Sequence, residues 1–295
     1  MPVLLGLDMG GTSVKAAIVS LEGGLIGSTN KQLNRSTGDT TPAKMVDLLV
    51  DCAQDVVSQS DLEWTNVAAI GLCTCAAVKD RDKGIIAGAA NLDGDWTDFP
   101  LRSETEKKLE LIAGCQIRIF LTTDFDAPAL AETWIGAAKG HANSVHICIG
   151  TGIGVSFLEN GHLIRGTNGI IEAGHIIVMP RGRQCGCGSR GCLEAYCAAP
   201  GIVEGVLSRM RAAFRDGSID AGSSQEKALF DYFGLKSGTL PSCKDVFEAA
   251  NYEPCSQNQI GTDLFRQICK QTVDEVCELL VSNIPTPARN PLKSE

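Results

Sequence analysis

Leu4-Leu-Gly-Leu-Asp-Met-Gly-Gly-Thr-Ser-Val-Lys-Ala-Ala-Ile-Val-Ser-Leu-Glu-Gly-Gly-Leu-Ile26 consists of apolar runs separated by glycine corners. β-Branched residues are frequent on both sides of the Gly-Gly-Thr corner, and a second turn, Glu-Gly-Gly, follows the second run. Such runs are typical of strands, and glycine pairs are typical of tight turns. The segment therefore predicts three strands joined by two turns.

A later segment repeats this order: Val145-His-Ile-Cys-Ile-Gly-Thr-Gly-Ile-Gly-Val-Ser-Phe-Leu-Glu-Asn-Gly-His-Leu-Ile164. It too reads as strand, glycine corner, strand, turn and strand. The repeat predicts an α/β protein with two similar halves and a cleft between them.

Both corners expose backbone N–H groups and a threonine hydroxyl without side-chain obstruction, which suits an anionic phosphate oxygen. Two such corners could hold one triphosphate. Each corner alone is equally consistent with an ordinary tight turn, because glycine-rich hairpins are common, but the pair, with Asp8 at the first, favours a phosphate. Neither corner matches the Walker or Rossmann glycine pattern, which disfavours those folds.

A third segment has the spacing of a metal site: Cys185-Gly-Cys-Gly-Ser-Arg-Gly-Cys192, preceded by His175. Zn²⁺ prefers four tetrahedral Cys and His ligands, and the glycines let this loop bend enough for Cys185, Cys187 and Cys192 to act together. His175 would be the fourth ligand. The alternative is a set of ordinary reduced thiols. Four protein ligands leave no position for an activated water, so the expected zinc is structural.

Composition and net charge narrow the classes of partner that this chain is expected to bind. The 295 residues are 44% hydrophobic, enough for a large core in one or two domains. The net charge of -9 and the lack of a basic block argue against nucleic acid and anionic lipid, so the expected partner is a small molecule. The 13 unevenly spaced cysteines fit a reducing compartment, and Asp8 comes too early for a signal peptide. We expect a cytoplasmic protein without a membrane span.

The last third of the chain reads as helices. Residues 201–214 and 263–282 carry apolar side chains at helical spacing. Shorter helices are expected over 225–233 and 243–250, within an irregular Gly/Ser-rich connection. The Pro-rich tail over 283–295 cannot form a central strand.

Taken together, these motifs resemble the ROK family of sugar kinases and repressors, within the actin/hexokinase-like superfamily. The Cys-x-Cys-Gly-x-x-Gly-Cys-x-Glu segment that follows Glu-x-Gly-His is the most specific element. The resemblance implies an α/β fold with two ribonuclease-H-like (actin-like ATPase) domains around a central cleft. The segments that carry it are residues 6–12, 91–96, 123–132, 150–154, 172–175 and 185–196.

The resemblance also implies domain limits. We expect one ribonuclease-H-like domain over 1–121 with the first phosphate corner, a second over 122–282 with the second corner, the catalytic aspartate and the zinc motif, and a Pro-rich tail over 283–295. Members of the family continue into a further strand and a Gly-Gly corner that contacts adenosine, and the sequence has no equivalent. The second domain is therefore expected to lack its usual C-terminal end, which would weaken ATP binding.

The resemblance also implies roles for individual residues, according to their positions in the matching motifs. Asp124 matches the catalytic aspartate of the family, which accepts the proton of the sugar hydroxyl as that hydroxyl attacks the γ-phosphate of ATP. The alternative is that Asp124 or Asp126 caps the helix that begins near Ala127. Asp8 would hold or position Mg²⁺. The residues expected to bind ATP or its phosphates are Asp8, Gly10, Gly11, Thr12, Lys15, Gly150, Thr151, Gly152 and Gly154.

Sugar binding is expected from carboxylates, an amide, a hydroxyl and an imidazole, which form paired hydrogen bonds with neighbouring sugar hydroxyls. The alternative for Asn91, which we favour less, is a turn with Asp93-Gly94. Thr123 stands where many members have Asn, which leaves the preferred sugar open. His175 would use one ring nitrogen for Zn²⁺ and the other for the sugar. The expected sugar-binding residues are Asn91, Thr123, Asp124, Glu172, His175 and Glu194.

The resemblance therefore predicts an ATP-dependent hexose kinase of carbohydrate metabolism that makes glucose 6-phosphate and uses ATP, Mg²⁺ and Zn²⁺. N-Acetylmannosamine, N-acetylglucosamine and fructose are alternative substrates. A truncated, catalytically weak or inactive sugar-binding protein is the alternative of another class. A repressor is disfavoured, since the chain is acidic and enters its first strand at Leu4 without a helix-turn-helix. The chain could form a homo-oligomer, but no residue in the sequence indicates which oligomeric state it has.

Overall fold

The computed structural model describes residues 1–89, 92–165, 171–217, 241–251 and 260–283. The chain forms two compact units. Unit 1 comprises residues 1–146 and 156–171, and unit 2 comprises residues 147–155 and 172–295. The domain limits expected at residues 121 and 282 remain a prediction.

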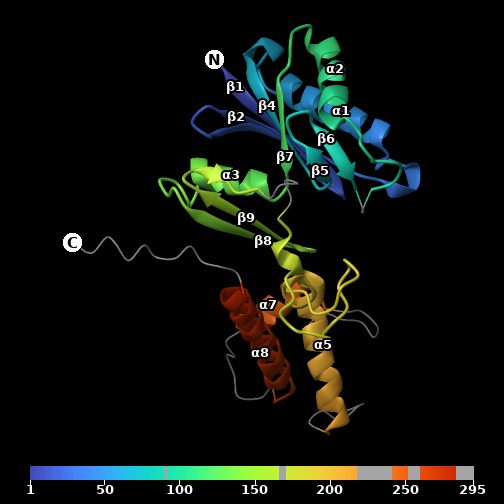
Figure 1. The fold of residues 1–295 in the computed structure, drawn as a ribbon, viewed down its shortest axis with the longest axis vertical. Coiled ribbons are helices and arrows are strands. Elements are labelled where there is room, and N and C mark those ends of the chain that lie inside the picture. The colour runs from blue at the N-terminus through green and yellow to red at the C-terminus, as the bar shows by residue number, and fades with distance from the viewer. Residues whose placement is uncertain (90–91, 166–170, 218–240, 252–259, 284–295) are drawn as a thin grey trace, which may run out of the picture. The chain divides into compact units, whose positions relative to one another are not determined.

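Unit 1 is built on a five-stranded sheet in the order β3-β2-β1-β4-β7 (Figure 1). Strands β1 to β3 form consecutive antiparallel hairpins, which confirms the prediction for residues 4–26. β4 pairs parallel with β1, and β7 pairs parallel with β4. The strands are β1 (Val3–Met9), β2 (Ser13–Ser20), β3 (Leu25–Gln32), β4 (Val67–Thr74) and β7 (Ile119–Thr123).

One face of this sheet forms the core of unit 1. Alternate residues of β1, including Leu5 and Leu7, are buried together with Leu49 of α1 (Pro42–Ser58) and Leu109 of α2 (Leu101–Ala113). This alternation is what a strand with one buried face requires. The two helices pack against each other and cover this face.

Shorter elements complete unit 1. β5 (Ala77–Asp80) and β6 (Ile85–Gly88) form a separate hairpin, and α3 (Asp126–Trp134) directly follows β7. Short 3-10 turns, η1 (Arg35–Thr37) and η2 (Trp64–Asn66), flank α1.

A three-stranded sheet has the order β10-β9-β8. Its strands are β8 (Ser144–Ile149), β9 (Ile153–Glu159) and β10 (His162–Leu163). Its first two strands each contribute residues to both units. The strand, corner, strand, turn and strand order predicted for residues 145–164 is confirmed.

Unit 2 is mainly helical in its described part. η3 (Ala173–His175) and α4 (Glu194–Cys197) flank the cysteine loop, and α5 (Ala199–Arg215), α7 (Cys243–Asn251) and α8 (Ile260–Asn283) pack on one another. The helices predicted over 201–214, 243–250 and 263–282 are confirmed. The helix predicted over 225–233 and residues 284–295 of the predicted tail lie outside the described residues.

Among the described residues, no helix is both long enough and apolar enough to cross a membrane.

Candidate active site

The carboxyl ends of the parallel strands of unit 1 meet at one edge of its sheet. The register pairs Asp8 of β1 with Cys73 of β4, and Thr74 of β4 with Thr123 of β7. The N–H of Asp124 donates to the carbonyl oxygen of Thr74 at 3.1 Å, one residue beyond the end of β7. Burial, followed by the negative charge of Asp8 and then that of Asp124, raises the pKa of the Cys73 thiol. Both predicted functional aspartates therefore lie around this thiol.

Asp8 has a charged partner in the first hairpin. Lys15 lies directly opposite Asp8 in the β1–β2 pairing, and its Nζ lies 3.1 Å from Asp8 Oδ2. The thiol of Cys73 donates to Asp8 Oδ1 at 3.4 Å. A solvent-exposed ion pair adds only about 0–1 kcal/mol to stability, so this pair matters mainly for where it places opposite charges.

The first glycine corner is a tight turn closed by its backbone. The N–H of Gly10 donates to the carbonyl oxygen of Ser13 at 3.1 Å. A Cβ on Gly10 would lie 2.9 Å from that oxygen, whereas a Cβ on Gly11 would meet no atom within 4 Å. The chain at Thr12 is held by the N–H of Leu33, which donates to the Thr12 carbonyl oxygen at 2.9 Å. The turn is confirmed, and phosphate binding by it remains a prediction.

The hydrogen bonds at the N-terminus of α3 show whether the Asp126 side chain caps this helix. The N–H of Asp126 donates to the Thr123 hydroxyl at 3.2 Å, so Thr123 holds the first turn. The Asp126 carboxylate is bound by Arg81 at 2.7 Å and by the Ser156 hydroxyl at 2.8 Å. The capping role considered for Asp126 is therefore wrong, because its carboxylate joins a network with residues far away in the sequence. Sequence reasoning missed this network, since no local pattern indicates it.

Asn91 lies outside the described residues, but the chain that follows it is well anchored. The hydroxyl of Thr40 donates to the Asp93 carboxylate, and the N–H of Asp93 donates back to that hydroxyl at 3.1 Å. The indole N–H of the buried Trp96 donates to the Asp93 carbonyl oxygen at 3.0 Å. Gly94 has a φ of 87°, so it forms the turn expected there. The sugar role of Asn91 remains a prediction.

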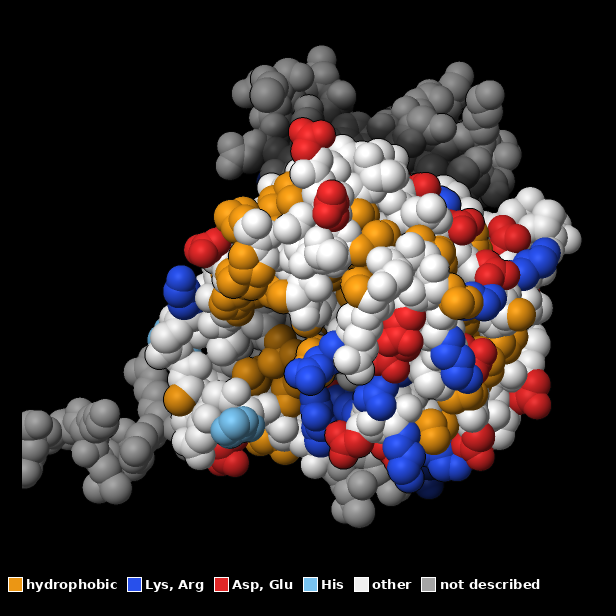
Figure 2. Space-filling view, turned by 90° about the horizontal axis from the view of Figure 1, so that it is seen from above, with side chains coloured by type: hydrophobic (Ala, Val, Ile, Leu, Met, Phe, Trp, Pro, Cys, Tyr) orange, Lys and Arg blue, Asp and Glu red, His pale blue; other side chains and the backbone are white. Residues whose placement is uncertain are grey.

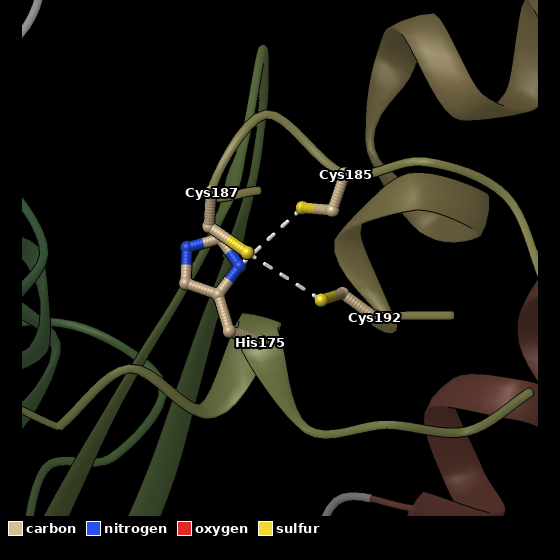
Figure 3. Close-up of side chains that lie close together, drawn as sticks. All are labelled: His175, Cys185, Cys187 and Cys192. Carbon is tan, nitrogen blue, oxygen red and sulfur yellow. Dashed lines mark hydrogen bonds between the residues drawn. The ribbon is translucent and has the colours of Figure 1, made fainter. Parts of the chain in front are cut away.

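In unit 2, one imidazole and three thiols converge (Figure 3). The ligand atoms of His175, Cys185, Cys187 and Cys192 all lie within 4.8 Å of one another. Nδ1 of His175 lies 3.6 Å from Sγ of Cys185, and the Sγ atoms of Cys187 and Cys192 are 3.6 Å apart. Tetrahedral Zn²⁺ with bonds of about 2.0–2.3 Å would separate its ligand atoms by roughly 3.5–3.8 Å. The donor set and its spacing therefore fit Zn²⁺.

Glycines and backbone hydrogen bonds shape the cysteine loop. Gly188 and Gly191 have φ values of 91° and 84°, in the left-handed region. The N–H of Cys185 donates to the Ser189 carbonyl oxygen at 2.9 Å, which closes the turn. A hydrogen bond with the Ser189 backbone lowers the pKa of the exposed Cys187 to about 7, while burial raises the pKa of Cys192 to about 12. A bound metal would be needed to keep the buried thiol ionised.

Glu194, the first residue of α4, links this cluster to the second glycine corner. Its Oε2 accepts a hydrogen bond from the N–H of Ile153 at 2.9 Å. Its Oε1 lies 3.7 Å from Sγ of Cys185 and 3.9 Å from Nδ1 of His175. A Cβ on Gly152 would lie 2.6 Å from Oε2, so this contact requires a glycine in the corner.

Glu172 lies on the other side of the imidazole. Its Oε2 is 4.0 Å from Nε2 of His175, so the two ring nitrogens face different carboxylates. Three of the predicted sugar-binding side chains, those of Glu172, His175 and Glu194, are therefore brought together in unit 2.

The second glycine corner lies against the start of α5. The N–H of Gly150 donates to the Gly152 carbonyl oxygen at 2.9 Å, and the N–H of Ala199 donates to the Gly150 carbonyl oxygen at 2.9 Å. Thr151 is exposed, whereas Gly154 is buried in β9. The turn is confirmed, and the exposed part of the corner is the part that is accessible to a ligand.

Comparisons with known proteins identify the family. The sequence profile of the ROK family matches residues 4–260. The chain belongs to the ROK family. Among its relatives, the glucokinase of Thermotoga maritima is 35% identical over 201 residues, which cover 68% of this chain and 58% of that protein. The glucokinase of Halalkalibacterium halodurans is 32% identical over 253 residues, covering 84% of this chain and 68% of that protein.

The relatives differ in activity. The xylose repressor of Bacillus subtilis is 27% identical over 206 residues, covering 70% of this chain and half of the repressor. Solved ROK proteins include both a glucokinase and a transcriptional regulator. The match spans less than two thirds of the Thermotoga maritima glucokinase.

Solved ROK structures have the same fold. The ROK glucokinase of Streptomyces griseus, solved with glucose and AMPPNP, is 25% identical with a TM-score of 0.65, covering 95% of this chain and 79% of that chain. The ROK hexokinase of Thermus thermophilus is 23% identical with a TM-score of 0.58, covering 97% of this chain and 91% of that chain. The predicted family and the predicted actin-like α/β fold are confirmed.

Proposed function

We propose that this ROK chain is a sugar kinase that transfers the γ-phosphate of ATP to a hexose, with glucose as the first candidate. The observation that carries the proposal is the position of Glu194. One of its carboxylate oxygens binds the backbone of the second glycine corner, and the other lies beside His175 and Cys185. A single side chain thus joins the expected phosphate, sugar and metal sites. The glucokinase relatives support the same activity.

In unit 1, the proposed chemistry uses the carboxyl edge of the sheet. Asp8 would hold Mg²⁺, and Lys15 would offer its charge to the phosphates. The first corner, Gly10, Gly11 and Thr12, would present backbone N–H groups to the same phosphates.

Asp124 would act as the base. It would accept the proton of the 6-hydroxyl while the sugar oxygen forms a bond to the γ-phosphorus. The bond between that phosphorus and its bridging oxygen breaks, and ADP leaves with the bonding electron pair. The products are a hexose 6-phosphate and ADP, and the proton remains on Asp124 until it passes to solvent.

In unit 2, Glu172, His175 and Glu194 would bind the sugar hydroxyls, together with Asn91 and Thr123. Two carboxylates that flank an imidazole are well suited to a polyol, since a substrate without these hydroxyls would leave them unpaired. The second corner, with Gly150, Thr151, Gly152 and Gly154, would bind ATP.

His175, Cys185, Cys187 and Cys192 would hold Zn²⁺. With four protein ligands, the ion would supply rigidity rather than an activated water. It would fix the imidazole with Nδ1 toward the metal, which leaves Nε2 on the side of Glu172.

The test is a coupled ADP-release assay with Mg²⁺-ATP and a panel of glucose, fructose, N-acetylmannosamine and N-acetylglucosamine, on protein assayed for zinc. Turnover with one sugar, lost in Asp124→Asn, would support the proposal and name the substrate. ADP release that is independent of sugar, or no turnover in zinc-loaded protein, would refute it.

A second candidate is a sugar-binding protein with weak or no turnover, as in a sugar-responsive regulator. It is favoured by the Thr123 hydroxyl, which already accepts the N–H of Asp126 and so has less capacity for a sugar. A rise in melting temperature with glucose, without ADP release, would support this candidate instead. A cytoplasmic location and a homo-oligomeric state remain predictions.

A further inference from the structure

A nearly buried ion pair lies beside the turn that carries the proposed base. Nη1 of Arg81 donates to Oδ2 of Asp126 at 2.7 Å, and the two side chains are only 14% and 13% exposed. In no other ion pair between described residues are both side chains so inaccessible to solvent. Figure 2 shows, by contrast, Lys and Arg side chains next to Asp and Glu side chains on the molecular surface. An exposed pair constrains its side chains little, whereas a buried pair stays together because an unpaired buried charge is costly.

The carboxylate of Asp126 is held through both of its oxygens. Oδ2 accepts the hydrogen bond from Arg81, and Oδ1 accepts one from the hydroxyl of Ser156 on β9 at 2.8 Å. Ser156 is 3% exposed, so its hydroxyl requires a partner inside the protein. Nε of Arg165 lies 3.9 Å from Oδ2 and places a second positive charge nearby. Residues from separate segments of unit 1 therefore fix the first side chain of α3.

The turn that carries Arg81 is itself fixed. It joins β5 to β6, and in it the N–H of Lys83 donates to Oδ1 of Asp80 at 2.9 Å. The N–H of Gly84 donates to the Arg81 carbonyl oxygen at 3.2 Å. A Cβ on Gly84 would collide with the side chain of Arg102, so this turn requires a glycine. β5 also contacts β7, the strand that leads to Asp124, so Arg81 is presented from a fixed position.

Asp124 lies inside a short turn that Asp126 closes. The N–H of Asp126 donates to the Thr123 hydroxyl at 3.2 Å, which links the two ends of the turn. The N–H of Asp124 donates to the Thr74 carbonyl oxygen at 3.1 Å, which ties the turn to β4. Only two peptide units separate Asp124 from Asp126. A shift of the Asp126 main chain would therefore move the Asp124 carboxylate.

We propose that the network centred on Asp126, with Arg81 as its charged partner, positions the carboxylate of Asp124 for catalysis. Its members are positioning residues, which hold the main chain around the base without touching the substrate. This role rests on the proposed function, in which Asp124 accepts the proton of the sugar hydroxyl. A base must lie within hydrogen-bond reach of that proton, and a misplacement of about 1 Å can lower a rate about a hundredfold.

The network should affect the rate of phosphate transfer more than the binding of sugar. Sugar affinity would come mainly from Glu172, His175 and Glu194, which are not among the described partners of Asp126. A disturbed network should therefore lower kcat and leave the KM for sugar nearly unchanged. A pair that only stabilised unit 1 would lower the melting temperature, but it would not change kcat per folded molecule.

The test measures kcat and KM of the full chain in the coupled ADP-release assay, with the sugar that the wild type turns over. Asp126→Ala removes both acceptors, so kcat should fall by about thirtyfold or more, with the KM for sugar within about threefold. Asp126→Asn keeps an oxygen for Arg81 and offers an N–H to the Ser156 hydroxyl, so kcat should return to within about threefold of the wild type.

A double variant tests whether the two charged residues act as a unit. Arg81→Met should lower kcat by about tenfold or more, because it leaves the Asp126 carboxylate without its closest charge. Adding Asp126→Ala to Arg81→Met should lower kcat by no more than about a further threefold, since the same contact is already lost. Independent roles would instead multiply the two effects.

A matched control is available at the opposite edge of the same sheet. Nζ of Lys31 on β3 lies 2.9 Å from Oδ2 of Asp55 on α1, so Lys31→Met also breaks an ion pair of unit 1. Its kcat should stay within about twofold of the wild type. Thermal melts check that each variant is folded at the assay temperature. If Asp126→Ala does not fold, Ser156→Ala replaces it, with an expected fall in kcat of about fivefold.

The outcomes separate this role from the proposed function. Wild-type turnover with unchanged kcat in folded Asp126→Ala would overturn the positioning role alone. The same conclusion would follow if Asp126→Asn were as slow as Asp126→Ala, or if the KM for sugar rose while kcat stayed the same. A wild-type chain that turns over no sugar would refute the proposed function, and the positioning role with it.

Discussion

The carboxylate edge of unit 1 and the cysteine loop of unit 2 achieve their geometry by different means. At the carboxylate edge, strand pairing fixes the backbone of Asp8 and Asp124, through the register with β4 and the hydrogen bond to Thr74. In the cysteine loop, short turns bring four ligand atoms within 4.8 Å without a regular sheet. The sheet needs no ligand to keep its shape, whereas the loop would depend on the proposed metal. Loss of one catalytic group and loss of one metal ligand should therefore have different consequences.

The largest effect is expected at the carboxylate edge. Asp124→Asn should lower kcat by about a thousandfold, because the amide cannot accept the proton of the sugar hydroxyl. The melting temperature should stay the same, since the contact with Thr74 uses the backbone N–H. A coupled assay and a thermal melt measure the two effects. Turnover within about tenfold of the wild type would show that another group is the base.

The second-largest effect should destabilise the cysteine loop of unit 2 and leave the sheet of unit 1 unchanged. Cys192→Ser removes a buried ligand, so zinc content should fall and amide exchange over residues 175–194 should accelerate by at least about tenfold, the effect of ~1.4 kcal/mol of local destabilisation. Exchange in the sheet of unit 1 should not change. Elemental analysis and hydrogen-exchange mass spectrometry measure both.

Cys115→Ser is the control, because Cys115 is outside the cluster. A chelator added to the wild-type chain should reproduce the Cys192→Ser result. Full zinc content in that variant, or acceleration in both units alike, would contradict a structural metal in unit 2.

A smaller effect is expected at the link between the second corner and the cluster. In Gly152→Ala, the new Cβ would lie 2.6 Å from Oε2 of Glu194, which forces the carboxylate away from His175. The KM for sugar should rise by about tenfold, corresponding to ~1.4 kcal/mol. Gly150→Ala is the matched control, since its Cβ meets no atom within 4 Å. An equal KM for sugar in both variants would show that Glu194 does not contribute to sugar binding.

The smallest effect concerns the thiol beside Asp8. Cys73→Ala removes the donor to Asp8 Oδ1, a contact worth about 0.5–1 kcal/mol. The Mg²⁺ concentration for half-maximal rate should rise by roughly two- to fivefold. Cys73→Ser keeps a donor and should restore most of the wild-type value. If serine and alanine behave alike, the contact does not orient Asp8.

The sequence predicts local features of this molecule well, because their signals are local. Both strand hairpins are visible in the alternation around glycine corners, and the helix over 199–215 is visible in its apolar period. The four proposed zinc ligands, His175, Cys185, Cys187 and Cys192, lie within a span of 18 residues, so spacing alone indicates them.

Contacts between distant residues could not be predicted in this way. Asp126 meets Arg81 and Ser156, which are 45 and 30 residues away, and Glu194 meets Ile153 across 41 residues. These contacts exist only once helices and strands have packed.

The contact between Gly152 and Glu194 also has an evolutionary consequence. A side chain at position 152 can exist only if the carboxylate at 194 withdraws, because the space is already filled by Oε2. The two positions should therefore change together among related sequences. A larger residue at 152 should accompany a shorter one at 194, and a chain that changes either alone should lose the link between its second glycine corner and its cysteine loop.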